Sequence, residues 1–509
     1  MPASRSRLQA TGSRDRLAPA DWEAIDALGA RRLANDSRAL KPGDTFVAYP
    51  GQERDGRDFI AQAVANGAAS VLWERGDFQW DARWRLPNHG VRELRRHAGE
   101  IASRVYGDPS RTLKVVGVTG TNGKTTCSQW IAQALTRAGR RCAVIGTLGY
   151  GMRPPLKPTI NTTPDALWLH AQLADFARRG AQAVAMEVSS IGLDQDRVAG
   201  IEFDVALFTN LSRDHLEYHR TMRRYGEAKA RLFAWESLKH AVVNLDDDFG
   251  AELARRIRRP GLGVVGYGFG AGSGRRARVA GSNLTTAARG VTFDVRTPWG
   301  SARVASRVLG RYNAYNLLGT LAVLLAGGIP LKRAVAALSA VKPVPGRLQR
   351  LGGGAQPLVI VDYAHTPDAL KQVLTTLREL LGTQSQVTNH KSRLFCVFGC
   401  GGDRDRGKRP LMGKVAARLA DRLVVTSDNP RSEDPRAIID EIMEGIEGKS
   451  GAVVADPDRR SAIQRAVEEA RRGDVVLIAG KGHESYQEIG ATRQPFSDAA
   501  VAREALARP

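Results

Sequence analysis

Apolar runs rich in β-branched residues alternate with amphipathic stretches through the middle of the chain. Between about residues 113 and 343 the apolar runs are LKVVGVTG, RCAVIGT, AQAVAMEVSS, FDVALFTN, HAVVNLD and GLGVVGYG. Runs of this kind, separated by helical spacing, are typical of a parallel sheet covered by helices on both faces. Between 275 and 310 apolar and polar residues alternate between glycines, which predicts a small antiparallel insert.

The two ends of the chain carry similar but separate patterns. Before residue 110, NDSRALKPGDTFVAYPG predicts a turn and a strand, and DFIAQAVANGAASVLWE predicts a helix and a strand. After the hinge-like KPVPGRLQRLG, a third α/β unit is indicated by PLVIVDYA, RLFCVFGC, DRLVVTSD and DVVLIAGKG. A chain of 509 residues has room for about three domains. We therefore predict an α/β protein with a small mixed domain at 1–112, a mostly parallel central domain at 113–342 and a third domain at 343–509.

Composition points to the cytoplasm. No apolar run approaches the ~18 residues that a membrane span requires, and the basic first 16 residues lack the apolar core of a secretory signal. The four cysteines form no CxxC pair and no zinc pattern, so we expect reduced thiols.

The net charge of +22 allows three interpretations. A basic surface can bind nucleic acid, attract a small polyanionic substrate, or simply be solvated. The excess is spread over the chain and not concentrated in one tract, which favours a solvated surface, and an anionic small molecule ranks before nucleic acid.

The stretch LKVVGVTGTNGKTTCSQWIAQAL, residues 113–135, predicts a strand, a phosphate-binding loop and a helix. It departs from the common GxxxxGK[ST] pattern, because Val118 stands where that pattern has glycine. Lys124 suits the β- and γ-phosphates and the Thr125 hydroxyl suits Mg²⁺. The predicted ATP-binding residues of the loop are Gly120, Thr121, Asn122, Gly123, Lys124, Thr125 and Thr126.

Two further side chains follow predicted strands at the edge where ligands bind in parallel sheets. Glu187 ends the run AVAMEV, and His215 follows FDVALFTN. His215 alone would be a structural or surface residue, but together with Glu187 it is a candidate magnesium ligand. No DExx run typical of helicase-like motors occurs in this region, which disfavours a mechanical ATPase.

Eight motifs together resemble the Mur ligases of peptidoglycan synthesis, and the resemblance runs in order from about residue 35 to 500. They are TGTNGKTT, MEVSSIGLDQDR, FTNLSRDHLEYH, YGEAKARLF, GRYNAYNLL, VPGRLQRL, VDYAHTPDAL and GKGHE. The resemblance implies an ATP-dependent, cytoplasmic ligase of cell wall biogenesis that extends a UDP-N-acetylmuramoyl peptide. It also implies a UDP-binding first domain, a central ATPase and a Rossmann-like third domain that receives the amino acid. We expect a monomer that binds no nucleic acid.

The motifs FGCGGDRDRGKRP and SDNPRSEDP resemble the family member that adds the third residue of the peptide. The DNPR form implies meso-diaminopimelate as the added amino acid, joined to UDP-N-acetylmuramoyl-L-alanyl-D-glutamate through an acyl phosphate. Arg431 can clamp the second carboxylate of diaminopimelate, for which L-lysine has no counterpart. By this resemblance the amino-acid site comprises Arg404, Asp428, Asn429, Pro430, Arg431, Gly480 and Glu484. Without the resemblance, DNPR would be a proline turn.

The resemblance assigns the remaining site residues. Lys229 would be carbamoylated and would bind magnesium with Thr125, Glu187 and His215; unmodified, it would add only a surface charge. The adenine, ribose and phosphates would be contacted by Asn313, Asn316, Arg347 and Asp362, although either asparagine could instead cap a helix. The UDP-sugar peptide would be contacted by Ser37, Asn161, Thr162, Thr163, Ser189, Gln195 and Arg197. Near the uracil, Gln52, Glu53 and Arg54 replace the His-Gln-Ala of some relatives.

Several alternatives stay open on sequence alone. The same ligase could take L-lysine, which Arg431 disfavours. Folylpolyglutamate synthases and the D-alanyl-D-alanine-adding ligase have related ATPase cores, but the pair of DNPR and GKGHE motifs argues against them. A nucleic-acid-binding ATPase would explain the charge and predicts ATP hydrolysis stimulated by DNA or RNA.

Overall fold

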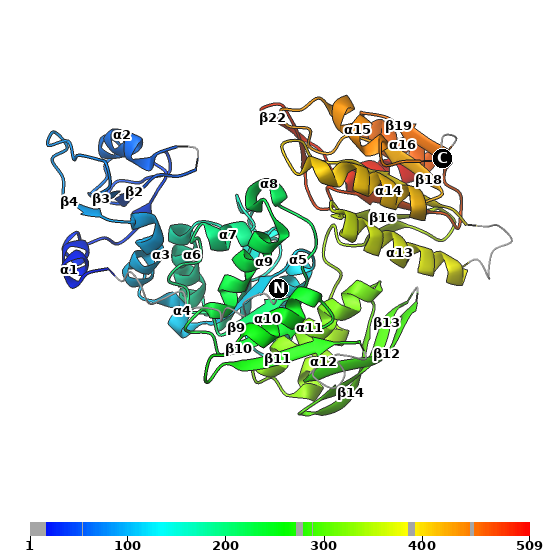
Figure 1. The fold of residues 1–509 in the computed structure, drawn as a ribbon, viewed down its shortest axis with the longest axis horizontal. Helices are drawn as coiled ribbons and strands as arrows, with labels where there is room; N and C mark the ends of the chain where they lie inside the picture. The colour runs from blue at the N-terminus through cyan, green and yellow to red at the C-terminus, as the bar shows by residue number, and fades with distance from the viewer. Residues whose placement is uncertain are drawn as a thin grey trace, which may run out of the picture.

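The computed structural model describes residues 17–52, 54–270, 278–287, 289–384, 392–447 and 452–508. The basic first 16 residues and Glu53, both noted in the sequence, lie outside the described residues. Figure 1 shows an N-terminal unit at the left, a central unit below and a C-terminal unit at the upper right. Each unit is built on its own sheet, and the sheets are mostly parallel, which confirms the predicted α/β class.

The N-terminal unit has a four-stranded parallel sheet in the order β1-β2-β3-β4. Its strands are β1 (Leu33–Ala34), β2 (Thr45–Ala48), β3 (Ser70–Glu74) and β4 (Asn88–Val91). Its helices are α1 (Pro19–Ala27), η1 (Gly56–Phe59), α2 (Ile60–Ala65), α3 (Leu94–Val105) and α4 (Pro109–Thr112). The apolar runs predicted β2, α2 and β3. β1 has only two residues, and β4 contains Asn88, His89 and Gly90 and so forms no apolar run.

The central unit has a ten-stranded sheet in the order β14-β13-β12-β11-β10-β9-β5-β8-β6-β7. Its strands are β5 (Lys114–Thr119), β6 (Cys142–Gly146), β7 (Gly149–Gly151), β8 (Ala183–Glu187), β9 (Val205–Phe208), β10 (His240–Asn244), β11 (Gly263–Gly268), β12 (Val279–Ala287), β13 (Gly290–Thr297) and β14 (Gly300–Ser306). Its helices are α5 (Lys124–Arg137), α6 (Ala166–Arg178), α7 (Ser190–Asp194), α8 (Leu216–His219), α9 (Met222–Ala230), η2 (Arg231–Ala234), α10 (Asp248–Arg256), α11 (Arg311–Ala326) and α12 (Leu331–Ser339).

The predicted antiparallel segment is present, but it is not a separate insert. β12 pairs with β11 in parallel, and β13 and β14 then follow in antiparallel register. The segment therefore extends the main sheet, because the edge of β11 offers unpaired backbone groups to the next strand.

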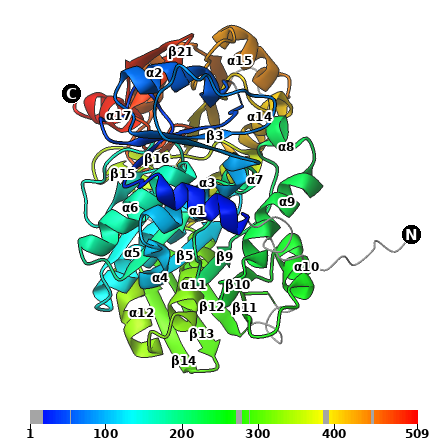
Figure 2. The ribbon, with the colours of Figure 1, turned by 90° about the vertical axis from the view of Figure 1, so that its left-hand side faces the viewer.

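Helices cover both faces of the central sheet, as its apolar strands require. One core lies under α5, α11 and α12 and includes Trp130 and Leu321; the other lies under α6 and α10 and includes Phe176 and Leu253. α3 and α4 pack against α6 and so join the N-terminal unit to the central one, which Figure 2 shows from the N-terminal side. On α6 the fully buried His170 bonds the Ala199 carbonyl oxygen at 2.9 Å through Nε2.

The C-terminal unit has a six-stranded sheet in the order β15-β16-β20-β17-β18-β19, in which only β15 is antiparallel. Its strands are β15 (Gln349–Gly352), β16 (Leu358–Asp362), β17 (Leu394–Phe398), β18 (Arg422–Val425), β19 (Val453–Ala455), β20 (Val475–Ala479), and the hairpin β21 (Tyr486–Ile489) and β22 (Thr492–Pro495). Its helices are α13 (Pro367–Gln384), η3 (Arg406–Lys408), α14 (Arg409–Leu419), α15 (Pro435–Met443), α16 (Arg459–Glu469) and α17 (Asp498–Leu506).

A buried ion pair holds the strand ends of this unit together. Arg459 and Asp498 make two hydrogen bonds of 2.8 Å, and both side chains are 0% exposed. Arg459 also donates to the carbonyl oxygens of Ser427 and Ala479, which follow β18 and end β20. The pair thus fixes the edge of the sheet from which the loops of the candidate amino-acid site emerge.

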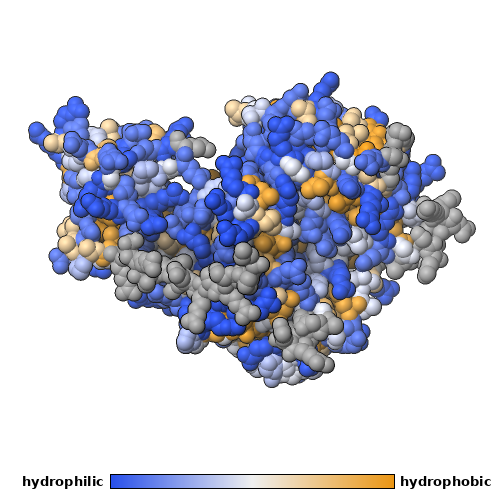
Figure 3. All heavy atoms as spheres, in the orientation of Figure 1, coloured by the Kyte–Doolittle hydropathy of each residue, from blue (hydrophilic) through white to orange (hydrophobic). Residues whose placement is uncertain are grey.

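The surface and the cysteines agree with the composition. Figure 3 shows one face covered mostly by hydrophilic residues, with a notch between the N-terminal and C-terminal units. Within the described residues, no helix is both long and apolar enough to span a membrane. Cys127, Cys142, Cys396 and Cys400 are free and buried, as predicted for reduced thiols, and burial raises the pKa of each.

Candidate active site

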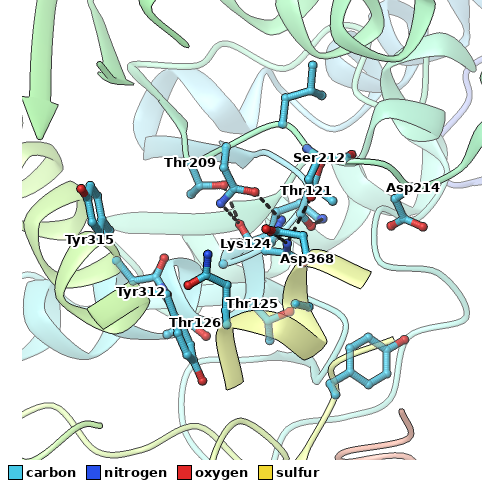
Figure 4. Close-up of a pocket in the computed structure, with 18 of the residues that line it drawn as sticks. Thr121, Lys124, Thr125, Thr126, Thr209, Ser212, Asp214, Tyr312, Tyr315 and Asp368 are labelled. Carbon is cyan, nitrogen blue, oxygen red and sulfur yellow. Dashed lines mark hydrogen bonds between the residues drawn. The ribbon is translucent and has the colours of Figure 1, made fainter. Parts of the chain in front are cut away.

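A cavity of about 550 Å³ lies where the carboxyl ends of the central strands meet the C-terminal unit. In Figure 4, Thr121 and Lys124 lie in its middle, with Tyr312 and Tyr315 of α11 to one side and Asp214 to the other. Its volume is within the usual range for a nucleotide-sized ligand. The predicted site residues that line it are Thr121, Asn122, Gly123, Lys124, Thr125, Thr126, Thr162, Glu187, Ser189, His215, Lys229, Asn316, Arg347 and Asp362.

The phosphate loop connects β5 to the first residue of α5, Lys124. Gly120 has a φ of 146°, and a Cβ there would lie 1.9 Å from Thr209 Oγ1, so the loop can pass only with glycine. Lys124 Nζ donates to the carbonyl oxygens of Gly120 and Thr121 at 2.9 and 2.8 Å. These bonds hold the Lys124 amine beside the N-terminus of α5, a position that suits a bound phosphate. Burial lowers the pKa of Lys124.

Glu187 is the buried end of β8 and connects the phosphate loop to the strand beside it. Its Oε2 accepts hydrogen bonds from the hydroxyls of Thr125 and Thr147 at 3.0 and 3.1 Å, and its Oε1 accepts from the Thr147 backbone N–H at 2.8 Å. Thr147, just after β6, was not predicted as a site residue; its position after a buried strand was the available signal.

Lys229, on α9, lines the same cavity and is only 1% exposed. Its Nζ donates to the Gly120 carbonyl oxygen at 2.8 Å and lies 4.2 Å from the centre of the Tyr225 ring. Burial first, and then the charge of Lys124, lower the pKa of Lys229 well below its usual value. A lowered pKa increases the share of neutral amine, which is the form that reacts with CO₂.

His215 precedes α8 with a φ of 52° and lies between two carboxylates. Its Nε2 is 3.4 Å from Asp214 Oδ2, and its Nδ1 is 3.5 Å from Glu217 Oε1. Burial alone would raise the pKa of Asp214, but the charges of His215, His365 and Lys408 together lower it. The C-terminal unit therefore contributes charge to the surroundings of His215.

The donor set near Glu187 fits one magnesium ion. Thr125 Oγ1 and Glu187 Oε2 are oxygen atoms of the kind Mg²⁺ prefers, and they lie 3.0 Å apart. Over the described ranges, His, Cys, Asp and Glu side chains form no group of three that could hold a metal.

Arg347, in the segment that leads to the C-terminal unit, reaches the phosphate loop. It donates to Thr125 Oγ1 at 3.0 Å and stacks over the ring of Tyr363 at 4.3 Å. Asp362 lies beside it, but both of its carboxylate oxygens accept backbone N–H groups of its own unit at 2.7 and 2.8 Å. Burial raises the pKa of Asp362.

Further contacts join the two units around the cavity. Arg213 forms a two-fold ion pair with Asp405, with distances of 2.8 and 3.0 Å. Asn122 of the phosphate loop donates to Asp368 Oδ2 at 3.2 Å. Asp368 was not predicted as a site residue, because it is a first-turn residue of α13 and enters the cavity only through docking of the two units.

The two asparagines of α11 are placed differently. Asn316 lines the cavity, whereas Asn313 donates to the Leu309 carbonyl oxygen at 2.8 Å and accepts from Asn316 at 3.1 Å. Tyr312 and Tyr315 line the cavity and were not predicted. Their spacing to Asn316 places all three on one helix face, which is a signal that the sequence contains.

The residues expected to bind the UDP-sugar peptide form a connected set beside Glu187. Thr163 Oγ1 donates to the Glu187 carbonyl oxygen at 2.9 Å and lies 3.2 Å from Ser189 Oγ. Arg197 donates to Gln195 Oε1 at 2.8 Å and to the Thr163 carbonyl oxygen at 2.9 Å. Of this set, Ser189 lines the cavity.

Three expected contacts lie apart from one another. Thr162 Oγ1 is 3.1 Å from Thr147 Oγ1 at the cavity wall, and Asn161 is exposed. Ser37 is buried in the N-terminal unit, where its hydroxyl donates to Gln62 at 2.7 Å. The structure therefore does not bring Ser37 into the cavity.

In the C-terminal unit two arginines flank Gly401. A Cβ on Gly401 would lie 3.0 Å from a terminal nitrogen of Arg431 and 3.8 Å from Cγ of Arg404. Arg431 donates to the Gly402 carbonyl oxygen at 2.7 Å, and its Nε is 3.4 Å from Glu488. The Arg431 guanidinium group and the Arg404 side chain thus both lie beside Gly401, on the loops that follow β17 and β18.

The other residues expected to bind the amino acid form a network under these arginines. Asn429 donates to Glu484 at 2.9 Å, and the fully buried Lys481 donates to both of them at 2.8 Å. Gly480 lies against Asp428, where a Cβ would be 2.4 Å from the carboxylate oxygen Oδ2. Lys481 was not predicted as a site residue.

Comparisons with known proteins agree with this geometry. Three family models match: Mur ligase family, catalytic domain at 31–106; Mur ligase middle domain at 118–324; and Mur ligase, glutamate ligase domain at 346–482. Two similar relatives are UDP-N-acetylmuramoyl-L-alanyl-D-glutamate–2,6-diaminopimelate ligases. The ligase of Nitrosomonas europaea is 52% identical to this chain, and the match covers 94% of this chain and 93% of the relative. The ligase of Chromobacterium violaceum is 50% identical, and the match covers 96% of this chain and 97% of the relative.

Solved structures show the same arrangement. A structure of a UDP-N-acetylmuramoyl-L-alanyl-D-glutamate–2,6-diaminopimelate ligase is 39% identical, with a TM-score of 0.66 and coverage of 94% of both chains. A D-alanyl-D-alanine-adding ligase from Acinetobacter baumannii, 20% identical with a TM-score of 0.64, covers 90% of this chain and 94% of its own and shares the fold. With the phosphate loop, the paired arginines and these matches in view, the chain belongs to the Mur ligase family.

Proposed function

We propose that the chain is an ATP-dependent ligase that adds meso-diaminopimelate to UDP-N-acetylmuramoyl-L-alanyl-D-glutamate in peptidoglycan precursor synthesis. The names of the similar relatives support this substrate pair. The geometric observation that carries the proposal is that the Arg431 guanidinium group and the Arg404 side chain both lie beside Gly401. Two arginines on neighbouring loops suit an amino acid with a second carboxylate, because each can bind a carboxylate bidentately.

The reaction joins a carboxylate to an amine, so the carboxylate must first be activated. Its oxygen attacks the γ-phosphorus of ATP, which forms an acyl phosphate and releases ADP. The amine of diaminopimelate then attacks the acyl carbon, phosphate leaves, and the amine loses a proton. Both steps bring anions together, so positioning and charge neutralisation carry the catalysis.

Residues of the chain divide this work between the units. Lys124 and the N-terminus of α5 hold the phosphates, and Arg347 approaches them from the C-terminal side. Asn316, Asn313 and Asp362 orient the nucleoside. Thr162, Thr163, Ser189, Gln195 and Arg197, with Asn161 and Ser37 further out, hold the UDP-sugar peptide. Asp428, Asn429, Pro430, Gly480 and Glu484 complete the amino-acid site.

Magnesium, when bound, neutralises the transferred phosphoryl group. Thr125, Glu187 and His215 would hold it, together with a carbamoylated Lys229. The fit of Thr125 and Glu187 supports the first position, and the lowered pKa of Lys229 supports its modification.

The three units are assigned to the three substrates. Residues 1–112 take the UDP end, 113–342 take ATP and 343–509 take the amino acid. The separate sheets of the units support these boundaries. We further propose that the chain is a monomer and that it acts in the cytoplasm. The four free, buried cysteines support the location.

The test measures the release of phosphate from ATP in the presence of the UDP-muramoyl dipeptide and either meso-diaminopimelate or L-lysine. We expect turnover with diaminopimelate alone, and in Arg431→Ala we expect a raised KM for diaminopimelate with little change in the KM for ATP. Arg436→Ala, which removes an exposed arginine of α15, is the matched control. Equal turnover with L-lysine would contradict the role of Arg431, and no turnover with either amino acid would contradict the proposed reaction.

A further inference from the structure

The two loops that carry Arg404 and Arg431 lie in direct backbone contact. The loop at 399–408 follows β17 and the loop at 426–434 follows β18. Gly402 N–H donates to the Asn429 carbonyl oxygen at 3.0 Å, and a Cβ on Gly402 would lie 1.9 Å from the Pro430 carbonyl oxygen. The relative position of the two arginines therefore depends on what fastens these loops to each other.

A buried arginine lies beneath both loops. Arg409, the first residue of α14, is 0% exposed and donates to both carboxylate oxygens of Glu433 at 2.9 and 2.8 Å. It also donates to Glu441 of α15 at 2.8 Å and to the Gly401 carbonyl oxygen at 3.3 Å. Glu433 belongs to the second loop, but its Oε1 accepts the backbone N–H of Asp403 in the first. The Glu433 side chain thus connects the second loop to the first loop and both of them to Arg409.

Hydrogen bonds between Ser432 and Asp403 also connect the same two loops. Ser432 donates from its hydroxyl to Asp403 Oδ1 at 2.6 Å and from its backbone N–H to Oδ2 at 3.3 Å. Asp403 and Arg431 have φ values of 54° and 52°. Residues other than glycine keep such conformations only where surrounding contacts hold them. The loop conformation that presents Arg431 therefore depends on these connections.

We propose that Glu433 is a positioning residue for recognition of the amino-acid substrate. By fastening one loop to the other it fixes the spacing of Arg404 and Arg431, and this spacing selects an amino acid with two carboxylates. The inference rests on the proposed function, because it takes these loops to be the diaminopimelate site.

Glu441 provides a matched comparison for a purely structural role. It bonds the same buried Arg409 and pairs with the exposed Arg406 of the first loop. Among the described residues, however, its side chain forms no hydrogen bond with the second loop, so it does not fasten one loop to the other. If the ion pair only stabilised the fold, removing the charge of Glu433 or of Glu441 would have the same effect on substrate binding.

The experiment compares Glu433→Gln, Glu441→Gln and Glu444→Gln, the last being a change of an exposed glutamate just after α15. For each variant, KM and kcat are measured for all three substrates, together with the turnover ratio of diaminopimelate to L-lysine. In Glu433→Gln we expect the KM for diaminopimelate to rise roughly tenfold, since charge-assisted bonds are lost. We expect the KM values for ATP and the UDP-muramoyl dipeptide to stay within about twofold in every variant.

The outcomes separate the possibilities. Equal rises of the diaminopimelate KM in Glu433→Gln and Glu441→Gln, or equal rises for all three substrates in Glu433→Gln, would overturn the positioning role. Should Glu433→Gln not fold, Ser432→Ala removes the hydrogen bond from the Ser432 hydroxyl to Asp403 and leaves the ion pair of Arg409 and Glu433 intact. It is expected to raise the same KM, and an unchanged KM there would overturn the proposal. Absence of diaminopimelate-dependent turnover in the wild type would instead refute the proposed function.

Discussion

Lys229 carries a prediction in which stability and activity change in opposite directions. Its ammonium is buried, has one carbonyl acceptor in Gly120 and lies over the face of Tyr225. It forms no ion pair within the described part of the chain. The change to test is Lys229→Met, which keeps the length of the side chain and removes the charge.

The expected gain follows from the cost of burying a charge without a partner. Replacing buried charges by apolar groups of similar volume is often neutral or stabilising by about 1–4 kcal/mol. A gain of about 2 kcal/mol in the free energy of unfolding corresponds to a melting temperature about 4–8 °C higher in a domain of this size. Ligase activity should be lost, because methionine cannot carry the carbamoylation that we propose for Lys229.

The pH dependence has a definite sign. Because the pKa of Lys229 is lowered below 10.5 in the folded chain, there is a pH range in which only the unfolded chain holds the proton. In that range wild-type stability rises with pH by up to about 1.4 kcal/mol per unit. The stability advantage of Lys229→Met should therefore shrink as pH rises toward 10.5.

The assay is thermal unfolding in CO₂-free buffer, with Lys332→Met as the control for an exposed lysine of the same unit. Addition of bicarbonate should stabilise the wild type and leave Lys229→Met unchanged. A Lys229→Met protein that melts below the wild type, or a stability difference that is flat with pH, would refute the reasoning.

Three further predictions concern other buried groups. Burial lowers the pKa of His170 from 6.5 to about 4, so the wild type should lose up to about 3 kcal/mol more stability than His170→Gln as pH falls through that range, measured by urea unfolding. Asp498→Asn should cost about 3–5 kcal/mol in thermal unfolding, because it leaves Arg459 buried without its partner; a loss below about 1 kcal/mol would contradict this. Arg347→Lys should lower kcat/KM for ATP at least roughly tenfold, because a lysine cannot reproduce the planar contact that reaches Thr125; unchanged ATP kinetics would remove Arg347 from the site.

The sequence predicted the strands of the central and C-terminal sheets well, because their residues are buried on both faces and read as continuous apolar runs. β5 and β8 are examples. It did not predict β15, whose burial alternates at the sheet edge and whose residues were read as part of a hinge. It also placed β12–β14 in an insert, since the pairing partner of a strand is a tertiary property that local patterning does not contain.

For the site, motifs at strand ends predicted residues that do meet. Lys124, Glu187 and Lys229 line one cavity. Asp368 and Thr147 were missed because they lie outside recognisable motifs and reach the cavity through packing between units or neighbouring strands. Patterns in sequence therefore identify residues on one element, while contacts between elements require the structure.

The buried cysteines have a practical consequence for following domain motion. All four thiols are at most 3% exposed, and burial raises the pKa of Cys127, Cys142 and Cys400 to about 12. A thiol that is both inaccessible and protonated reacts slowly with maleimides. Cysteines introduced at exposed positions of the central and C-terminal units can thus be labelled in the otherwise wild-type chain. Fluorophore pairs attached there would report the distance between the units during turnover.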